Sequence, residues 1–177
     1  WLLVLLGLGM VVSSVVGLFE GVVAQLTLIV CFQSLVLDMA GNVGTQSLAV
    51  TIRVLMDEKL NGKDKLKLTL KEMKIGFCNG GLLGVFALVC LGVYIVLFKG
   101  YAIGTAFLIS GCVGVALLVS IIISSLVGTL VPIFFKKIKV DPAVASGPLI
   151  TTVNDLVAVV TYYGLAWLFL IQIMHIV

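Results

Sequence analysis

Two aspartates, Asp38 and Asp155, stand inside stretches of sequence that are otherwise apolar. If a membrane helix begins near Ala143, Asp155 lies roughly 18 Å along it at about 1.5 Å per residue, close to the middle of a bilayer. A charged carboxylate at that depth costs on the order of 3 kcal/mol. Such a side chain is therefore paired, hydrated or bound to a cation, so both aspartates are candidate site residues.

Oxygen-bearing residues accompany both aspartates, and no basic residue lies at a similar depth. The candidate metal-binding residues are Asp38, Gly41, Asn42, Thr45, Gly147, Thr151, Asn154 and Asp155. Carboxylate, amide, hydroxyl and carbonyl oxygens are the ligands of hard cations such as Mg²⁺ and Ca²⁺. Thr151 and Asp155 are four residues apart, so a helix places them on one face, which Gly147 extends backwards. Pro148 could free a carbonyl near Gly147, although a simple proline kink explains this residue equally well.

The composition excludes a water-soluble globule. Of the 177 residues, 62% are hydrophobic and 11% are charged, whereas roughly a quarter of the residues in a soluble domain are charged. The mean hydropathy is +1.31. Apart from Lys99, the basic residues form two clusters, Arg53 to Lys74 and Lys136 to Lys139. Hydrophobic spans flank both clusters, which indicates the cytoplasmic ends of membrane helices and no nucleic-acid partner.

These features predict an all-α polytopic membrane protein with five spans, forming a single transmembrane domain over residues 1–177. The spans are expected at about 1–19, 22–56, 70–98, 102–135 and 143–175. The positive-inside rule places both lysine-rich loops on the cytoplasmic side of the plasma or inner membrane. The N-terminus is then cytoplasmic, and the C-terminus lies outside. The segment 59–74 is expected to be an amphipathic entry to the third span, lying against anionic headgroups.

The second span is too long for a simple crossing. From Val22 to Met56 a continuous helix would measure roughly 50 Å, against an apolar slab of about 30 Å. We expect a tilted or broken helix whose polar middle, Gly41 to Ser47, lines a wet cavity. A polar helix contact through small residues is the alternative. Two ladders of small residues predict packing faces: Gly76, Gly80 and Gly84, then Ser120, Ser124 and Gly128.

Few ligands are available in one protomer, so we expect a symmetric homodimer whose axis duplicates Asp155. Mg²⁺ holds its waters tightly, and a pore would therefore contact a largely hydrated ion. Mn²⁺, Co²⁺ and Ca²⁺ are alternative transported ions, and a proton- or Na⁺-coupled carrier or exporter at the same site is a second hypothesis. An intramembrane aspartyl protease using Asp38 and Asp155 is a third, but its G-x-G-D context is missing, so no enzyme is expected.

The remaining ionisable and sulfur-containing residues receive structural interpretations. His175 is expected to be an interface residue near the outer end of the last span. The four cysteines, Cys31, Cys78, Cys90 and Cys112, lie in apolar runs without C-x-x-C spacing. We interpret them as small buried apolar residues, neither a disulfide framework nor a thiolate metal site.

Four blocks of sequence resemble the transmembrane domain of MgtE-type magnesium channels, which are related to solute-carrier family 41. The blocks are GMVVSSVVGLFE, DMAGNVGTQSLAVTIRVL, LKEMKIG and VDPAVASGPLITTVNDLVAVVTYYGLA, and the match extends over essentially the whole chain. The resemblance implies a dimer of five-helix domains in which the second and fifth helices line a central Mg²⁺ pathway. It places the pore aspartate of the family at Asp155 and the pore-facing backbone at Thr151. The G-N-x-G-x-Q motif falls on Gly41, Asn42, Gly44 and Gln46.

The chain departs from the family pattern at several points. Some members carry Asn where this chain has Thr45 and Gly147, which leaves contacts at the site to backbone or water. Ala40 replaces a glycine that often precedes Gly41. Full-length members carry a cytoplasmic N-terminal domain and a pair of CBS domains, whereas this chain opens at Trp1. We expect either a fragment of a longer protein or a short form without that regulation.

Overall fold

The computed structural model describes residues 2–25, 27–56 and 61–173. Its elements are α1 (Leu2–Leu18), α2 (Glu20–Gln25), α3 (Thr27–Leu55), α4 (Gly62–Lys99), α5 (Ile103–Lys137) and α6 (Pro142–Ala166), followed by a π-helical segment, η1 (Trp167–Ile173). Helix accounts for 94% of the structure, which confirms the all-α class. Among the described residues, four helices are long and apolar enough to cross a membrane, and α1 is a shorter apolar helix. His175 lies outside the described residues.

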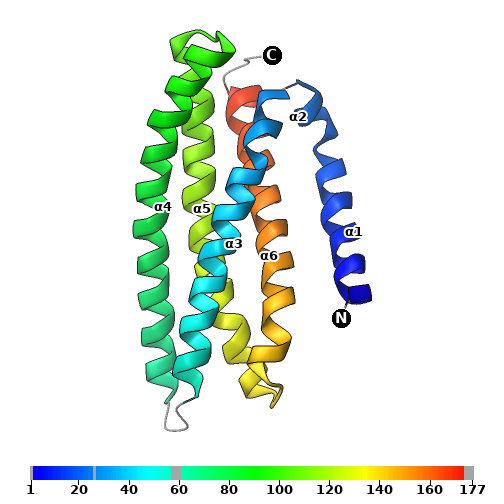
Figure 1. Cartoon of the computed structure of the whole chain (residues 1–177), viewed down its shortest axis with the longest axis vertical. Helices are drawn as coiled ribbons and strands as arrows, with labels where there is room; N and C mark the ends of the chain where they lie inside the picture. Colours follow the sequence, from blue (N-terminus) through cyan, green and yellow to red (C-terminus); the bar gives the residue numbers. More distant parts are fainter. Residues whose placement is uncertain (1, 26, 57–60, 174–177) are drawn as a thin grey trace.

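Helices α3 to α6 form an antiparallel bundle, and α1 stands beside α6 at its edge (Figure 1). Helix α5 is central because it packs on α3, α4 and α6. The start of α4 and the end of α5, which carry the two lysine clusters, lie at the same end of the bundle (Figure 1). This arrangement agrees with the expectation that both lysine-rich segments lie on one side of a membrane.

Helix α3 is continuous from Thr27 to Leu55, so a break in the polar middle of the second span, Gly41 to Ser47, is wrong. Its 29 residues would span about 44 Å, which leaves a tilted crossing as the geometry that fits a bilayer. Within this polar middle, Gly44 serves close packing. A Cβ on Gly44 would overlap the side-chain amide of Asn154 on α6. Residues 20–25 form the separate short helix α2.

Helix α4 is a single helix of 38 residues that begins at Gly62, eight residues before the expected start of the third span. The amphipathic entry segment continues into the span without a break. At its start, the Asn61 backbone N–H donates to the Asp64 carboxylate (3.3 Å), a pairing typical of helix N-termini. At its end, Gly100 adopts φ 70°, a left-handed conformation that stops the helix and turns the chain towards α5.

The small-residue ladders of α4 and α5 are packing faces, as predicted. A Cβ on Gly84 would lie 2.8 Å from the Gly114 carbonyl oxygen, so the two backbones touch where the helices cross. Further along the same face, Gly76 lies against the Ser125 side chain. Since only glycine permits such an approach, these positions determine how closely α4 and α5 pack.

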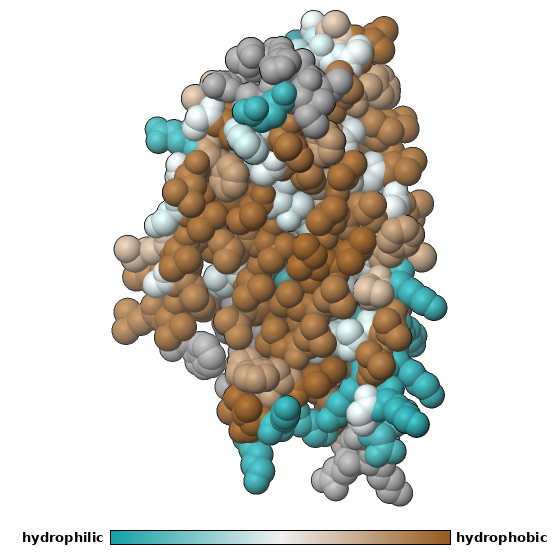
Figure 2. Space-filling model, turned by 180° about the vertical axis from the view of Figure 1, so that it is seen from behind, coloured by the Kyte–Doolittle hydropathy of each residue, from teal (hydrophilic) through white to brown (hydrophobic). Residues whose placement is uncertain are grey.

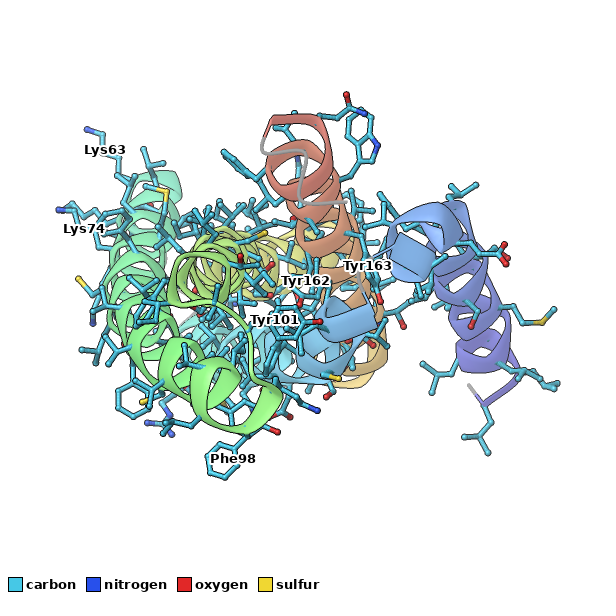
Figure 3. The ribbon with its side chains drawn as sticks, turned by 90° about the horizontal axis from the view of Figure 1, so that it is seen from above. Lys63, Lys74, Phe98, Tyr101, Tyr162 and Tyr163 are labelled. Atoms are coloured by element: carbon cyan, nitrogen blue, oxygen red, sulfur yellow. The ribbon has the colours of Figure 1, made fainter. Side chains whose placement is uncertain are left out.

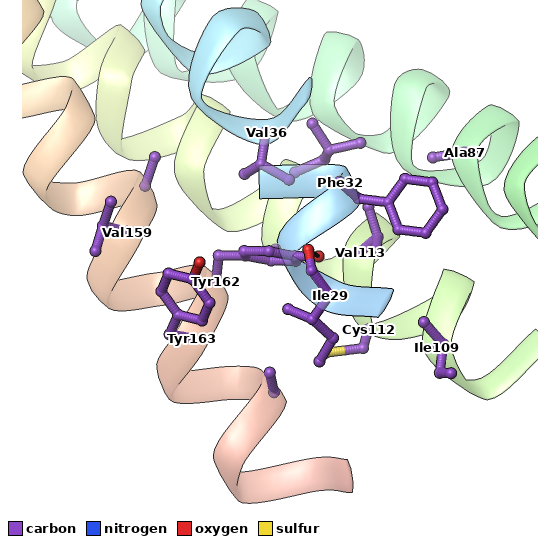
Figure 4. Packing of buried hydrophobic residues seen from close by; sticks show 14 of the residues in the cluster. Ile29, Phe32, Val36, Ala87, Ile109, Cys112, Val113, Val159, Tyr162 and Tyr163 are labelled. Atoms are coloured by element: carbon purple, nitrogen blue, oxygen red, sulfur yellow. Dashed lines mark hydrogen bonds between the residues drawn. The ribbon is translucent and has the colours of Figure 1, made fainter. Parts of the chain in front are cut away.

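The apolar core lies between α3, α5 and α6, where Ile29, Val36, Val113 and Tyr162 are fully or almost fully buried (Figure 4). The cysteines differ from expectation, because Cys112 is buried in this core whereas Cys31, Cys78 and Cys90 are exposed. The outer surface is itself apolar over a broad band between two polar ends (Figure 2). Cysteine behaves as a small apolar residue, so placing these side chains against lipid costs little free energy.

Candidate functional site

A polar groove of about 440 Å³ lies between α3 and α6. Its lining residues are Ser34, Leu37, Asp38, Gly41, Asn42, Thr45, Thr151 and Asp155. Six of these eight are residues that the sequence analysis selected as candidate ligands. The fold therefore brings two polar stretches that are distant in the sequence to a single surface.

Helical periodicity places the α3 residues of the groove on one face of that helix. Ser34, Asp38 and Thr45 are separated by four and seven residues, which is close to whole turns. Asp38, Asn42 and Thr45 have exposed side chains. The buried residues of α3 include Val36, Ala40, Val43 and Ser47, which face the bundle. Helix α3 thus packs through one face and leaves its polar face open.

Two threonine hydroxyls in the groove are oriented by backbone carbonyls. The Thr45 hydroxyl lies 3.0 Å from the Gly41 carbonyl oxygen and 2.9 Å from that of Asn42, and donates to this pair. The Thr151 hydroxyl donates to the Gly147 carbonyl oxygen at 3.1 Å. Because each hydrogen is directed to the backbone, the free lone pairs of each oxygen can accept from water or contact a cation. Gly147 does not line the groove, but its carbonyl positions Thr151.

The two groove carboxylates have no basic partner among the described residues. Asp38 is exposed and Asp155 is partly buried, and neither forms an ion pair or a hydrogen bond with the described part of the chain. An unpaired carboxylate on a membrane helix marks a place where a cation or water is expected. Residues 2–25, 27–56 and 61–173 contain no cluster of three acidic, His or Cys side chains that could enclose a bare metal ion. The arrangement suits an ion that stays largely hydrated.

Like Gly147, Asn154 is a candidate ligand that does not line the groove. It neighbours Asp155, but adjacent helical residues point about 100° apart, and the Asn154 side chain is fully buried. Its amide packs against Gly44 of α3, and neither amide atom has a hydrogen-bond partner in the described structure. A ligand role would require Asn154 to leave this position, and that role stays a prediction.

Contacts at both ends of α3 hold its groove face in place. Near its start, the Tyr162 hydroxyl donates to the Ile29 carbonyl oxygen at 2.8 Å (Figure 4). At its end, the Lys136 ammonium donates to the Leu55 carbonyl oxygen. A cation at a helix C-terminus also interacts favourably with the helix dipole. These contacts tie α3 to α6 and α5, respectively.

Glu72 is an acidic residue whose environment the sequence analysis missed. We expected two deep acidic residues, but Glu72 on α4 is also buried, with 4% of its surface exposed. The Ser47 hydroxyl on α3 donates to its carboxylate at 2.9 Å. Glu72 sits four residues before Gly76, on the face that packs against α5. The four-residue spacing from Gly76 could have identified Glu72 as a buried residue, but the neighbouring lysines suggested an exposed charged segment.

Replacing Ser47 with Ala is expected to lower the free energy of unfolding by about 1–2 kcal/mol, because a buried Glu72 oxygen loses its donor. In an E72A background the same Ser47 change should cost much less. The difference is the coupling energy of a double-mutant cycle, measured by unfolding in detergent. S14A is the control, since the Ser14 hydroxyl is bonded only to its own helix and lies on an exposed side chain. Equal costs of S47A in both backgrounds would show that the contact is not stabilising.

Comparisons with known proteins identify a family and several relatives. The family described as MgtE, divalent cation transporter, matches residues 33–165. Over 170 residues the chain is 36% identical to the magnesium transporter MgtE of Bacillus subtilis and 36% identical to that of Enterococcus faecalis. It is 32% identical over 170 residues to the protein of that name from Thermus thermophilus.

Each match covers 96% of this chain and 36% of the relative, so the chain spans about a third of the length of these curated relatives. The family match includes every residue that lines the groove, from Ser34 to Asp155. The four long apolar helices are those of a multi-pass membrane protein. This chain belongs to the MgtE family of divalent cation transporters.

Proposed function

We propose that this chain forms the ion pathway of a magnesium transporter and that hydrated Mg²⁺ passes along the groove between α3 and α6. The main support is the gathering of Asp38, Asn42, Thr45, Thr151 and Asp155 around one open volume. The relatives named as magnesium transporters indicate the ion. Mn²⁺, Co²⁺ and Ca²⁺ use the same oxygen ligands and are secondary candidates.

The open groove supports a dimer. One wall is formed by α3 and α6, and the side that faces away from the bundle is uncovered in a single chain. Polar residues in the hydrocarbon region face a bundle interior or a water-filled cavity, because exposure to lipid is costly. A second copy, related by a two-fold axis, would cover the groove and double the carboxylates around it. Isologous pairing of this kind is the commonest oligomer symmetry.

The strong hydration of Mg²⁺ explains why an open groove suits its passage better than a closed set of direct ligands. Mg²⁺ demands near-octahedral geometry and loses its waters reluctantly. The Asp38 and Asp155 carboxylates would attract the ion and accept hydrogen bonds from its waters. The oriented hydroxyl oxygens of Thr45 and Thr151 would accept from further waters. The site then selects for charge and size without removing the hydration shell.

The lysine distribution supports an orientation. Lys63, Lys71 and Lys137 belong to the two clusters at the same end of the bundle. The positive-inside rule places that end on the cytoplasmic side. We infer a cytoplasmic N-terminus with α1 as the fifth, shortest span. Its 17 residues are near the lower limit for crossing a bilayer.

A cross-linking experiment tests the pore and the dimer together. The four native cysteines are replaced by Ala, and Ser34, which lines the groove with an exposed side chain, is changed to Cys. We expect a short bifunctional maleimide to convert S34C into covalent dimers in proteoliposomes and to lower Mg²⁺ influx several-fold. In the dimer two copies of this position face one another across a narrow pathway.

The matched control retains only Cys90, which is exposed on α4. Helix α4 contributes no residue to the groove, so the reagent should neither cross-link Cys90 into dimers nor change Mg²⁺ influx. Equal cross-linking at the two positions would contradict the assigned interface. Intact influx after complete S34C cross-linking would contradict the assigned pathway.

A further inference from the structure

Four lysines form a stripe along the first part of α4. Lys63, Lys67, Lys71 and Lys74 follow at intervals of four, four and three residues, and all four side chains are exposed. These intervals place them on one face of the helix. Lys63 and Lys74 project from the same side of α4, away from the bundle (Figure 3). None of the four forms an ion pair with the described part of the chain.

An apolar slot begins where this stripe ends. The slot has a volume of about 400 Å³ and is lined by Met73, Lys74, Phe77 and Cys78 of α4 and by Ile122 of α5. Lys74 is its one charged lining residue. The Phe77 side chain is 60% exposed, so the slot opens on the outer surface of the α4–α5 pair. The aliphatic stem of Lys74 therefore lines an apolar hollow, while its side chain projects away from the bundle (Figure 3).

The slot lies at the level where the surface changes from charged to apolar. After Lys74, helix α4 carries no charged residue until Lys99 at its other end. Hydrophilic side chains gather at one end of the molecule over the start of α4, directly below the broad apolar band (Figure 2). Lysines at such a boundary lie at the depth of the lipid headgroups.

We propose that this surface is a binding site for an anionic phospholipid. The ammonium groups of Lys71 and Lys74 hold its phosphate, and one acyl chain lies in the slot against Phe77, Cys78 and Ile122. Charge complementarity selects an anionic lipid, because the lysines have no acidic partner in the described structure. A zwitterionic headgroup carries its own ammonium, which offsets the attraction. This site lies on α4 and α5 and does not depend on the ion groove between α3 and α6.

Lipid retention on the purified chain tests the lysine part of the site. Native mass spectrometry compares phosphatidylglycerol with phosphatidylcholine at equal concentration in detergent. We expect at least about fivefold more bound phosphatidylglycerol, and the K71Q/K74Q variant should lose this preference. K63Q/K67Q is the matched control, because it removes the same charge from the same face farther from the slot. If both double variants lost the preference for phosphatidylglycerol equally, the lysines would attract anionic lipid only through general surface charge, and the proposed site would be wrong.

A second pair of variants tests the acyl slot while leaving every lysine in place. C78F fills the slot, whereas C90F adds the same bulk at another exposed position of α4. We expect C78F to lower phosphatidylglycerol retention at least about threefold and C90F to change it less than twofold. Unchanged retention in C78F, or equal retention of the two lipids by the unmodified chain, would refute the proposal. Each readout is independent of Mg²⁺ transport.

Discussion

Replacing Asp155 with Asn is expected to lower Mg²⁺ influx through the reconstituted chain by at least about tenfold. The change preserves the size of the side chain and removes its negative charge from the groove. Two unit charges 4 Å apart interact by about 4 kcal/mol at an effective dielectric constant of 20, and about 1.4 kcal/mol already corresponds to a tenfold effect. The proposed dimer would lose this attraction twice. The measurement is influx into proteoliposomes loaded with a Mg²⁺-sensitive dye.

Glu20 provides the control for the Asp155 variant. It is an exposed acidic residue in the first turn of α2, outside the groove. E20Q should retain influx within about twofold of the unmodified chain. Undiminished influx in D155N would reject the assigned pathway. A proton or Na⁺ gradient that drives Mg²⁺ uphill would instead favour the coupled carrier at the same site.

Replacing Gly128 with Ala is expected to lower the free energy of unfolding by at least about 2 kcal/mol, since a methyl group would be forced into a tightly packed contact. A Cβ on Gly128 would overlap the Gly44 carbonyl oxygen and lie 3.1 Å from Ser47 Cβ. Backbone cannot rotate away as a side chain can, so α5 and α3 must separate. That movement also displaces the face of α3 that bears Asp38 and Asn42, and influx should fall with stability.

Gly81 gives the matched comparison for Gly128. It lies within α4, and a Cβ there would meet nothing within 4 Å. G81A should be neutral or should stabilise the helix by up to about 1 kcal/mol, because Ala loses less backbone freedom than Gly in a helix. Unfolding in detergent, followed by circular dichroism, measures both variants. If G128A were as stable as G81A, the close approach of α3 and α5 would be wrong.

The class of this protein could be predicted from composition, because few polar residues are available to cover a water-exposed surface. The run lengths between charged segments also located the long helices, although Gly62 rather than Leu70 begins α4. Boundaries were harder because an amphipathic segment can continue into a membrane helix without any change of conformation. The length of the second span did not predict its conformation, because either a tilted helix or a broken helix would fit the bilayer. The structure shows a helix that is continuous through the polar middle, where Gly44 packs against Asn154 of α6.

The candidate site was predicted in part. Asp38, Asn42 and Thr45 share a face at helical spacing, and so do Thr151 and Asp155, because that relation depends only on the helical repeat. Their meeting in one groove depends on how α3 and α6 cross. Asn154 shows the limit of this reasoning. Its polar side chain suggested a ligand, but the rotation of α6 turns it against Gly44.

By itself, the sequence determined the properties that depend on composition and on short stretches of chain. These are the membrane environment, the helices, the unpaired acidic residues and the membership of a transporter family. Tertiary structure alone decided which faces meet. It buried Glu72 beside Ser47 and left Asp38 exposed beside Asp155 in the groove. The physical reason is that the rotation of a helix about its axis results from many weak contacts with several neighbours. Close glycine contacts such as Gly84 with Gly114 then fix which faces of α4 and α5 meet.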